Sequence, residues 1–324
     1  MHTIGTPLMW TVFTVLILVA LAVDFLVLQR NGAHRVSTRE ALLWSIAWIA
    51  LALLFNLGLW WYLHETLPAP DAHRIAMEFF TGYLVEKALA VDNIFVFLMI
   101  FGYFAVPAEQ QQRALIIGII GAIVLRGILI LIGAALIAQF HWILYVFGVF
   151  LLLTGAKMLF SAGDPPDLND NPALKWMRRH LRLTDRFHGN ALRVTENGVR
   201  RFTPLFVVMA LIAVTDVIFA VDSIPAIFAI TTDPFIVLTS NVFAVLGLRA
   251  LYFLLAGMAE KFHLLGHGLA LVLIFIGSKM LIMDVYKIPI GIALGVVAAL
   301  VGGAMLLSVL RPKKEAPVQP PGVG

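Results

Sequence analysis

The sequence predicts an all-α polytopic membrane protein with about nine transmembrane helices, six of them arranged as a 3+3 inverted-topology repeat. Three observations predict this fold class. Sixty-one per cent of the 324 residues are apolar and 13% are charged, and the mean hydropathy is +0.94, values outside the range of soluble domains. Nine apolar runs are long enough to cross about 30 Å of hydrocarbon. Charged motifs inside these runs occur twice, which predicts the repeat.

The expected helices are counted from runs of roughly 20 apolar residues, the length that a helix needs to span a bilayer. The first run is expected to be a transmembrane helix and not a cleaved signal peptide, because its basic flank follows the run instead of preceding it. In chain order, the nine runs cover 8–28, 41–63, 76–104, 113–138, 141–160, 204–232, 238–258, 262–283 and 287–309.

Lysine and arginine residues alternate between the loops in a way that predicts the orientation of the chain. Arg74 and Lys287 are the two that fall in loops on one side of nine alternating helices, whereas most of the 23 fall on the other side. Positively charged loops are retained in the cytoplasm. We therefore expect a multi-pass protein of the bacterial inner (cytoplasmic) membrane with its N-terminus outside and its C-terminus in the cytoplasm. The basic residues of the cytoplasmic side are Arg30, Arg35, Arg39, Arg113, the eight between 175 and 201, Lys261, Arg311, Lys313 and Lys314.

A charged stretch inside the third apolar run has a counterpart in the sixth. It contains Glu86 and Asp92, which are matched by Asp216 and Asp222 at the same six-residue spacing. Arginines, histidines and lysines farther along the two copies align as well, which chance similarity between apolar runs would not produce. The pattern indicates an internal duplication.

Each copy of this duplication holds three helices. Because three is odd and the loop between the copies stays in the cytoplasm, the second copy is expected to run inverted in the membrane, a plan common among secondary transporters. The expected organisation is two N-terminal transmembrane helices at 1–70, repeat A at 71–160, a cytoplasmic amphipathic-helix loop at 161–203, repeat B at 204–283, a last transmembrane helix at 284–310 and a disordered cytoplasmic tail at 311–324.

The loop between the repeats contains an amphipathic segment at 173–183. Apolar residues such as Leu174 and Met177 recur there at helical spacing among basic residues, a pattern typical of a helix that lies on anionic lipid. We therefore expect anionic lipid as the partner of this segment and no nucleic acid, although a net charge of +4 would suggest nucleic acid in a soluble protein. Farther on, Asn197-Gly198 between two short segments predicts a hairpin.

The four acids of the duplicated motif are candidates to bind a cation. A charge at the centre of a membrane helix costs roughly 2.5–3.5 kcal/mol and is found mainly at functional sites. Oxygen ligands suit hard divalent cations such as Mn²⁺, Mg²⁺ or Ca²⁺, and the lack of cysteine argues against a soft metal. The residue types leave the choice among the three ions open. The candidate ligands are Glu86, Asp92, Asp216, Asp222, Asn93 and Ser223.

Acids six residues apart do not share a face of a regular helix, because six steps of about 100° leave them about 120° apart. Two arrangements would still let them share an ion. The helices could be interrupted near Asp92 and Asp222, where Pro225 and polar neighbours permit a break. Alternatively, the acids of one repeat could face those of the other across a pseudo-twofold axis.

Basic residues in the same runs support a competing, purely structural hypothesis. Lys87, Arg126 and Arg249 could balance the charge of three acids and tie helices together as a buried ion network. Asp24, near the expected cytoplasmic end of the first helix, is either an accessory site residue or an acid that reaches interfacial water. Two further lysines at helix ends are expected to snorkel to the interface, namely Lys157 and Lys279.

The energy source for moving a cation can be inferred from the absence of a nucleotide-binding motif and from the membrane potential. No G-x-x-x-x-G-K-[ST] sequence occurs, so we expect no use of ATP through a P-loop of this chain. Expelling a divalent cation against an inside-negative potential costs about 4.6 kcal/mol per 100 mV, so a passive pore would admit the cation. Burial favours the neutral form of a carboxylic acid, and protons therefore compete with the metal. The residues favour cation export in exchange for protons, and no enzyme is expected.

Two long polar motifs resemble signatures of the TerC family of bacterial membrane proteins. They are EKALAVDNIFVF at 86–97 and TDVIFAVDSIPAIFAIT at 215–231. Similar stretches at 246–257 and 277–290 extend the resemblance to about residue 310 and bring it closest to a branch of manganese exporters. One departure is Thr215, where serine is frequent, and it keeps the hydroxyl.

This resemblance implies an inner-membrane protein that exports manganese, with the four acids as its metal site and with Asn93 and Ser223 adjacent. The transported ions are expected to be Mn²⁺ and protons, and no cofactor is expected. Two alternatives stay open. One is an exporter of Ca²⁺ or other divalent cations, and the other is a non-transport membrane partner that helps to assemble or metallate exported proteins.

Overall fold

The computed structural model describes residues 3–31, 37–161, 171–196, 198–256 and 264–310, and helices dominate this part of the chain. Its elements, in order, are α1 (Pro7–Asn31), α2 (Thr38–Thr66), α3 (Ala69–Tyr103), α4 (Ala108–Gln139), α5 (Ile143–Ser161), α6 (Pro172–His180), β1 (Arg193–Glu196), β2 (Val199–Phe202), α7 (Pro204–Phe228), α8 (Pro234–Leu246), α9 (Leu248–Ala256), α10 (Leu265–Leu281) and α11 (Ile290–Leu310).

The helices confirm a polytopic membrane protein. Within the described residues, six helices are long and apolar enough to cross a membrane, and a seventh span is obtained if α8 and α9, bent by 41°, count as one. The other two predicted runs correspond to α3 and α10. Helix α3 is continuous over 35 residues, but charged residues interrupt its apolar sequence, and α10 has only 17 residues. Each predicted run thus coincides with a helix or with the bent pair, and nine crossings stay a prediction.

Local sequence signals set the ends of the helices. Ser37 accepts a hydrogen bond from the backbone N–H of Glu40 and caps α2, which is one of the two hydrogen bonds of a capping box. Thr203 caps α7 and Asp233 caps α8 through their side chains, and a proline follows each of them at the first helical position. The bend between α8 and α9 falls at Gly247.

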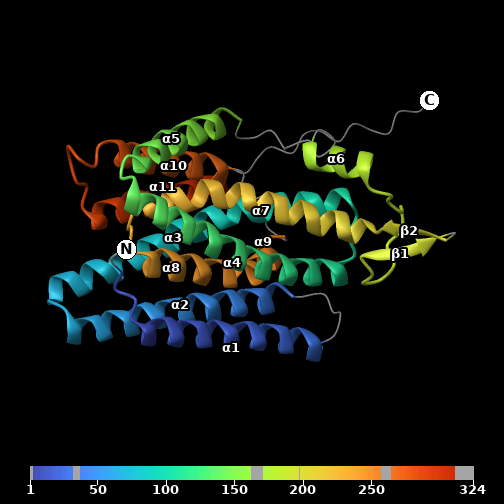
Figure 1. Ribbon diagram of the computed structural model, residues 1–324, viewed down its shortest axis with the longest axis horizontal. Helices are drawn as coiled ribbons and strands as arrows, with labels where there is room; N and C mark the ends of the chain where they lie inside the picture. Colours follow the sequence, from blue (N-terminus) through green and yellow to red (C-terminus); the bar gives the residue numbers. More distant parts are fainter. Residues whose placement is uncertain (1–2, 32–36, 162–170, 197, 257–263, 311–324) are drawn as a thin grey trace.

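The helices form three layers (Figure 1). The α1–α2 pair lies along one side, α3, α4, α7 and α8 form the centre, and α5, α10 and α11 lie on the other side. An aromatic cluster joins the first layer to the centre, with the ring of Phe55 on α2 4.7 Å from that of Phe243 and 5.4 Å from that of Phe79.

Packing between the two predicted repeats is reciprocal. The first helix of each repeat packs against the second helix of the other, so that α3 contacts α8 and α7 contacts α4. The third helices, α5 and α10, pack closely against each other. Gly155 and Gly277 permit this approach, because an added Cβ at either glycine would lie within 2.8 Å of backbone on the opposite helix.

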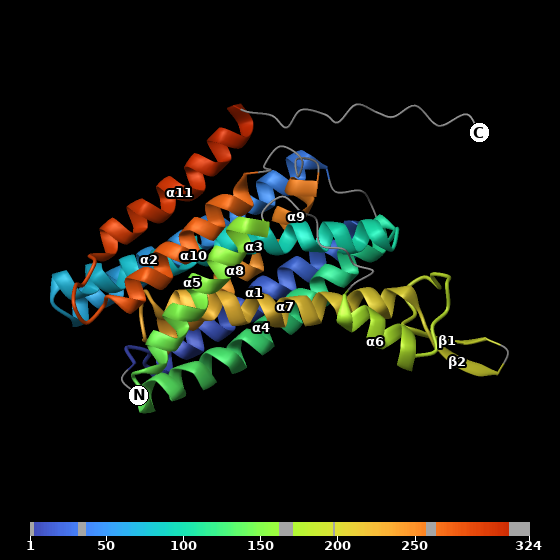
Figure 2. The same ribbon diagram turned by 90° about the horizontal axis from the view of Figure 1, so that it is seen from above.

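The segment between the repeats forms a small cap beyond one end of α7 (Figures 1 and 2). The predicted hairpin is present, with β1 and β2 antiparallel and with Gly198 at a φ of +76° in the turn. The side chain of Asn171 caps α6, but the apolar residues Leu174 and Met177 of this helix are buried in the protein core beside α7. The face that we expected on lipid is therefore covered by the protein itself.

The predicted tail at 311–324 lies outside the described residues.

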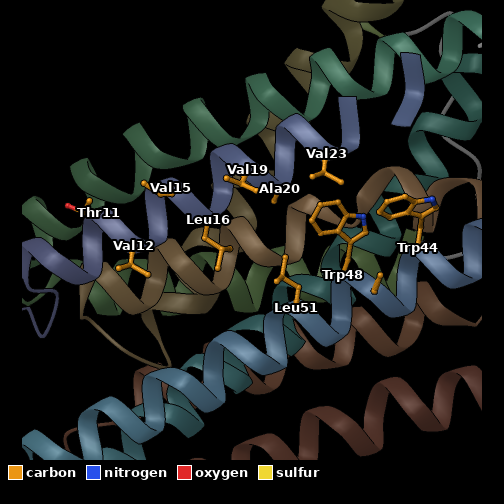
Figure 3. A pocket seen from close by; sticks show the side chains of 11 residues that line it. Thr11, Val12, Val15, Leu16, Val19, Ala20, Val23, Trp44, Trp48 and Leu51 are labelled. Carbon is orange, nitrogen blue, oxygen red and sulfur yellow. The ribbon is translucent and has the colours of Figure 1, made fainter. Parts of the chain in front are cut away.

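An apolar groove of about 640 Å³ runs between α1 and α2 (Figure 3). Its walls are almost entirely apolar and carry no acidic side chain, so it is unsuited to bind a cation. It is lined by Thr11, Val12, Val15, Leu16, Val19, Ala20, Val23, Trp44, Ala47, Trp48 and Leu51.

Candidate functional site

A buried arginine on α4 joins acids of α3 and α7. Arg126 Nη1 donates a hydrogen bond to Glu86 Oε1 of α3 and another, 3.2 Å long, to Ser223 Oγ. Its Nη2 donates to Asp216 Oδ1 of α7 over 3.4 Å. None of the four residues is more than 4% exposed. We call this group of Glu86, Arg126, Asp216 and Ser223 the Arg126 centre.

Helix periodicity explains how two polar residues of α7 reach the same arginine. Asp216 and Ser223 are seven residues apart, which is close to two full turns and places them on one face. Glu86 and Asn93 have the same spacing on α3, and Asn93 is also buried. The two pairs occupy equivalent positions in the two predicted copies, so the duplicated motif supplies matching polar faces to the centre of the protein.

Both acids of the Arg126 centre keep an oxygen that the arginine does not use. Glu86 Oε2 and Asp216 Oδ2 are buried and have no hydrogen-bond partner among the described residues, and neither has Arg126 Nε. Buried polar atoms without partners are uncommon because each costs desolvation free energy. Carboxylate oxygens are also the ligands that hard divalent cations prefer. The centre therefore has ligand atoms available to a cation.

The four predicted acids are not gathered into one site in this conformation. Asp222 is half-buried on a different face of α7, where it interacts with α5 by a hydrogen bond to Thr154 and by attraction to Lys157. The backbone of α3 is helical through Asp92, whose side chain lies outside the described part of the structure. In the parts that are described, no three His, Cys, Asp or Glu side chains are close enough to hold a metal ion.

The proposed helix interruptions near the acids are absent. Helices α3 and α7 continue through Asp92 and Asp222, and Pro225 is accommodated inside α7. The sharp bend lies instead between α8 and α9. Of the two arrangements that the spacing allowed, the structure favours the second, because Glu86 and Asp216 are equivalent acids of the two copies and meet at one arginine.

Of the three predicted charge-balancing residues, Arg126 is the one that contacts the predicted acids in the described structure. Lys87 Nζ donates a hydrogen bond, 3.1 Å long, to the carbonyl of Ala244 in the last turn of α8. A Cβ at Gly247 would lie 2.6 Å from this ammonium, so the glycine makes room for it. Lys87 thus satisfies a carbonyl at the α8–α9 bend, where helix geometry leaves carbonyls without partners.

Arg249, the third of these residues, forms an ion pair with Asp24 of α1. Both side chains are almost fully buried, with Asp24 7% and Arg249 9% exposed. The interpretation of Asp24 as an acid in interfacial water is therefore not what the structure shows, and the pair attaches α1 to α9. The sequence provided no signal for this pairing, because the two residues are far apart in the chain.

Removing one partner of this pair is expected to destabilise the protein more than removing both. Arg249→Met should lower the free energy of unfolding in detergent by about 1–3 kcal/mol, since it leaves a buried carboxylate unpaired. Adding Asp24→Leu to Arg249→Met should recover most of this loss. Unfolding midpoints of the two single variants and the double variant measure the coupling, and strictly additive midpoints would contradict the pairing.

Fold and site together define a polytopic membrane protein whose buried polar centre joins acids from two helices through one arginine. The chain belongs to the TerC family, since residues 71–316 match the integral membrane protein TerC family. This confirms the resemblance of its motifs. The matched region begins where the first predicted repeat begins.

Relatives cover nearly the whole chain. A protein of Photorhabdus laumondii is 54% identical over 98% of this chain and 99% of its own, and one of Escherichia coli K12 is 56% identical over 92% of each. Both carry a provisional name, membrane-bound redox modulator Alx. An uncharacterized membrane protein of Myxococcus xanthus, STKORF319, is 44% identical over 97% of this chain and 96% of its own. No solved structure matches the chain.

Proposed function

We propose that this protein is a secondary transporter of the bacterial inner membrane that exports Mn²⁺ from the cytoplasm in exchange for protons, and that it is not an enzyme. The observation that carries the proposal is the Arg126 centre, in which equivalent acids of two helices are buried together and each keeps an oxygen that has no hydrogen-bond partner in the described part of the chain. A cation that reaches the centre would find two carboxylate ligands, and Asn93 lies buried farther along the same face of α3.

A 3+3 inverted repeat supports this proposal. The reciprocal packing of α3 on α8 and of α7 on α4 is what two inverted copies related by a pseudo-twofold axis would produce. Transporters built in this way alternate between states by moving one repeat against the other. Asp222, held by Thr154 and Lys157 of α5, would join the ion in another state of the cycle.

Proton exchange follows from the burial of the acids. A carboxylate that loses its cation inside a low-dielectric site is stabilised by taking up a proton. The proton moves inward down its gradient while the cation moves outward. In proteoliposomes, Mn²⁺ transport should therefore accelerate when a pH gradient is imposed, and a rate that is independent of the gradient would refute the coupling.

The provisional names of the relatives refer to redox modulation. Since the chain contains no cysteine, it cannot itself take part in thiol–disulfide exchange. We infer that a redox effect would arise through the amount of manganese in the cell.

We also propose that the basic surface of α6, where Trp176 is 57% exposed, contacts anionic lipid headgroups, with its apolar face occupied by the protein.

Substitutions that neutralise acids outside the Arg126 centre test the transport function. Cells that express Asp92→Asn or Asp222→Asn under manganese load should accumulate manganese to the level of cells without the protein, whereas the wild type keeps intracellular manganese low. The matched control is Lys175→Gln with Arg179→Gln, which changes the basic cap and should leave efflux intact. Elemental analysis of washed cells is the measurement.

The reverse pattern would favour the alternative function, a membrane partner in assembly or metallation, because the cytoplasmic cap would then be the active surface. Replacing Mn²⁺ by Ca²⁺ or Mg²⁺ in the same vesicles decides the selectivity. Equal transport of all three ions would refute a manganese-specific exporter.

A further inference from the structure

A polar pocket lies at the end of the protein opposite the β1–β2 hairpin. It has a volume of about 470 Å³ and is lined by charged residues from several elements, including Arg74 and Glu78 of α3, Asp233 before α8, and Lys287. Ile4 also lines it, and the N-terminus lies at this end in Figure 1. The orientation predicted from the basic loops places this pocket on the outer face of the membrane.

Glu78, which lines the pocket, interacts with two cations. It is 8% exposed and accepts a hydrogen bond from Arg74 one turn earlier on α3. Lys279 of α10 also attracts Glu78, and its Nζ donates a hydrogen bond of 3.1 Å to the carbonyl of Ala229 at the end of α7. Lys279 was expected to snorkel to the interface, but it ties α10 both to α3 and to the helix that carries Asp216.

A tightly packed layer separates Glu78 from the Arg126 centre. Gly82 lies midway between Glu78 and Glu86, one helical turn of about 6 Å from each and on the same face of α3. A Cβ at Gly82 would lie 2.9 Å from Ser240 Oγ of α8 and 3.5 Å from Ile227 Cγ2 of α7. Ser240 is fully buried. The route from the centre to the outer pocket is therefore closed by α3, α7 and α8 in this conformation.

We propose that Glu78 and Lys279 form an outer gate, and that the pocket above it is the exit through which the exported divalent cation leaves. The gate rests on the proposed export function. Lys279 donates to the carbonyl of Ala229 at the end of α7 and attracts Glu78 of α3, so it holds the ends of α3, α7 and α10 together and keeps the layer at Gly82 closed.

Cysteine accessibility tests the gate directly, because the chain has no cysteine of its own. Ser240→Cys places one thiol in the closed layer, and His141→Cys places one at the exposed rim of the pocket. A membrane-impermeant maleimide added to intact cells should label His141→Cys readily and Ser240→Cys slowly. Adding Lys279→Gln, which removes the charge but keeps a hydrogen-bond donor, should make labelling of Ser240→Cys at least about tenfold faster, because a charged hydrogen bond is stronger than a neutral one.

Two further variants separate the gate from a general loss of folding. Lys279→Arg keeps the charge and should restore slow labelling of Ser240→Cys. Arg74→Gln should leave this labelling slow, because Arg74 pairs with acids of its own helix and does not link α3 to another helix. Equal labelling of Ser240→Cys in all backgrounds would overturn the proposal, as would failure of His141→Cys to react from outside. Accelerated labelling in a protein that moves no Mn²⁺ would leave the gate intact and refute the proposed cargo alone.

Discussion

Glu86→Gln and Asp216→Asn are each expected to abolish manganese export while the protein still inserts and folds. Each change keeps the size of the side chain and a hydrogen-bond acceptor for Arg126, but it removes one charged ligand from the Arg126 centre. Loss of even an outer partner of a metal ligand costs about 10–100-fold in affinity or activity, so loss of a ligand itself should cost at least as much. Initial rates of Mn²⁺ uptake into inside-out vesicles measure the effect.

The matched control for these variants is Glu65→Gln, which neutralises an exposed acid at the end of α2. It should transport as the wild type does. If Glu86→Gln and Asp216→Asn transported at the rate of the control, the Arg126 centre would be an ion network that holds helices together, and the cation would have to bind elsewhere.

Arg126→Met is expected to have the largest effect on stability of any single substitution in the described structure. Arg126 is fully buried and contacts two acids and a hydroxyl. Removing one member of a buried ion network leaves uncompensated charge and costs about 3–5 kcal/mol. We therefore expect a low yield of folded protein and a clearly lower unfolding midpoint in detergent. The unfolding midpoint of Arg126→Lys should fall between those of the wild type and Arg126→Met, because an ammonium group keeps the charge but cannot reproduce the planar fork of a guanidinium.

A triple variant separates stability from transport. Combining Arg126→Met with Glu86→Gln and Asp216→Asn removes all three charges, and it should recover most of the lost stability because no buried charge is left unpaired. It should still fail to export manganese. A triple variant that folds and exports would show that the centre serves only to pack the helices, whereas a stable Arg126→Met single variant would contradict the ion network.

The helices could be predicted from the sequence because hydrocarbon requires every backbone polar group to be satisfied within the segment. That requirement makes a long apolar run almost equivalent to a helix, and the capping residues at Ser37, Thr203 and Asp233 set where helices begin. The equivalence of Glu86 and Asp216 was also predictable, because duplicated motifs keep their spacing. So was the separation of Asp216 from Asp222, which follows from the helical angle alone.

The partner of each charge could not be predicted. Three basic residues were candidates to pair with the four acids. In the structure Arg126 pairs with two of these acids, Glu86 and Asp216. Lys87 binds a backbone carbonyl instead, and Arg249 pairs with Asp24. A side chain reaches only a few ångströms, so its partner depends on which helices are neighbours and how each is rotated about its axis. That information is distributed over the whole packed core.

The amphipathic segment after α5 also shows which features the sequence predicts and which depend on packing. Its periodicity predicted helix α6 and the apolar face that contains Leu174 and Met177, but the face is covered by protein and not by lipid. The sequence by itself determined the helices, their order and the duplicated acids, since these follow from local hydrophobicity and spacing. The tertiary structure alone decided what each face touches, because contacts between distant segments depend on packing that no local pattern records.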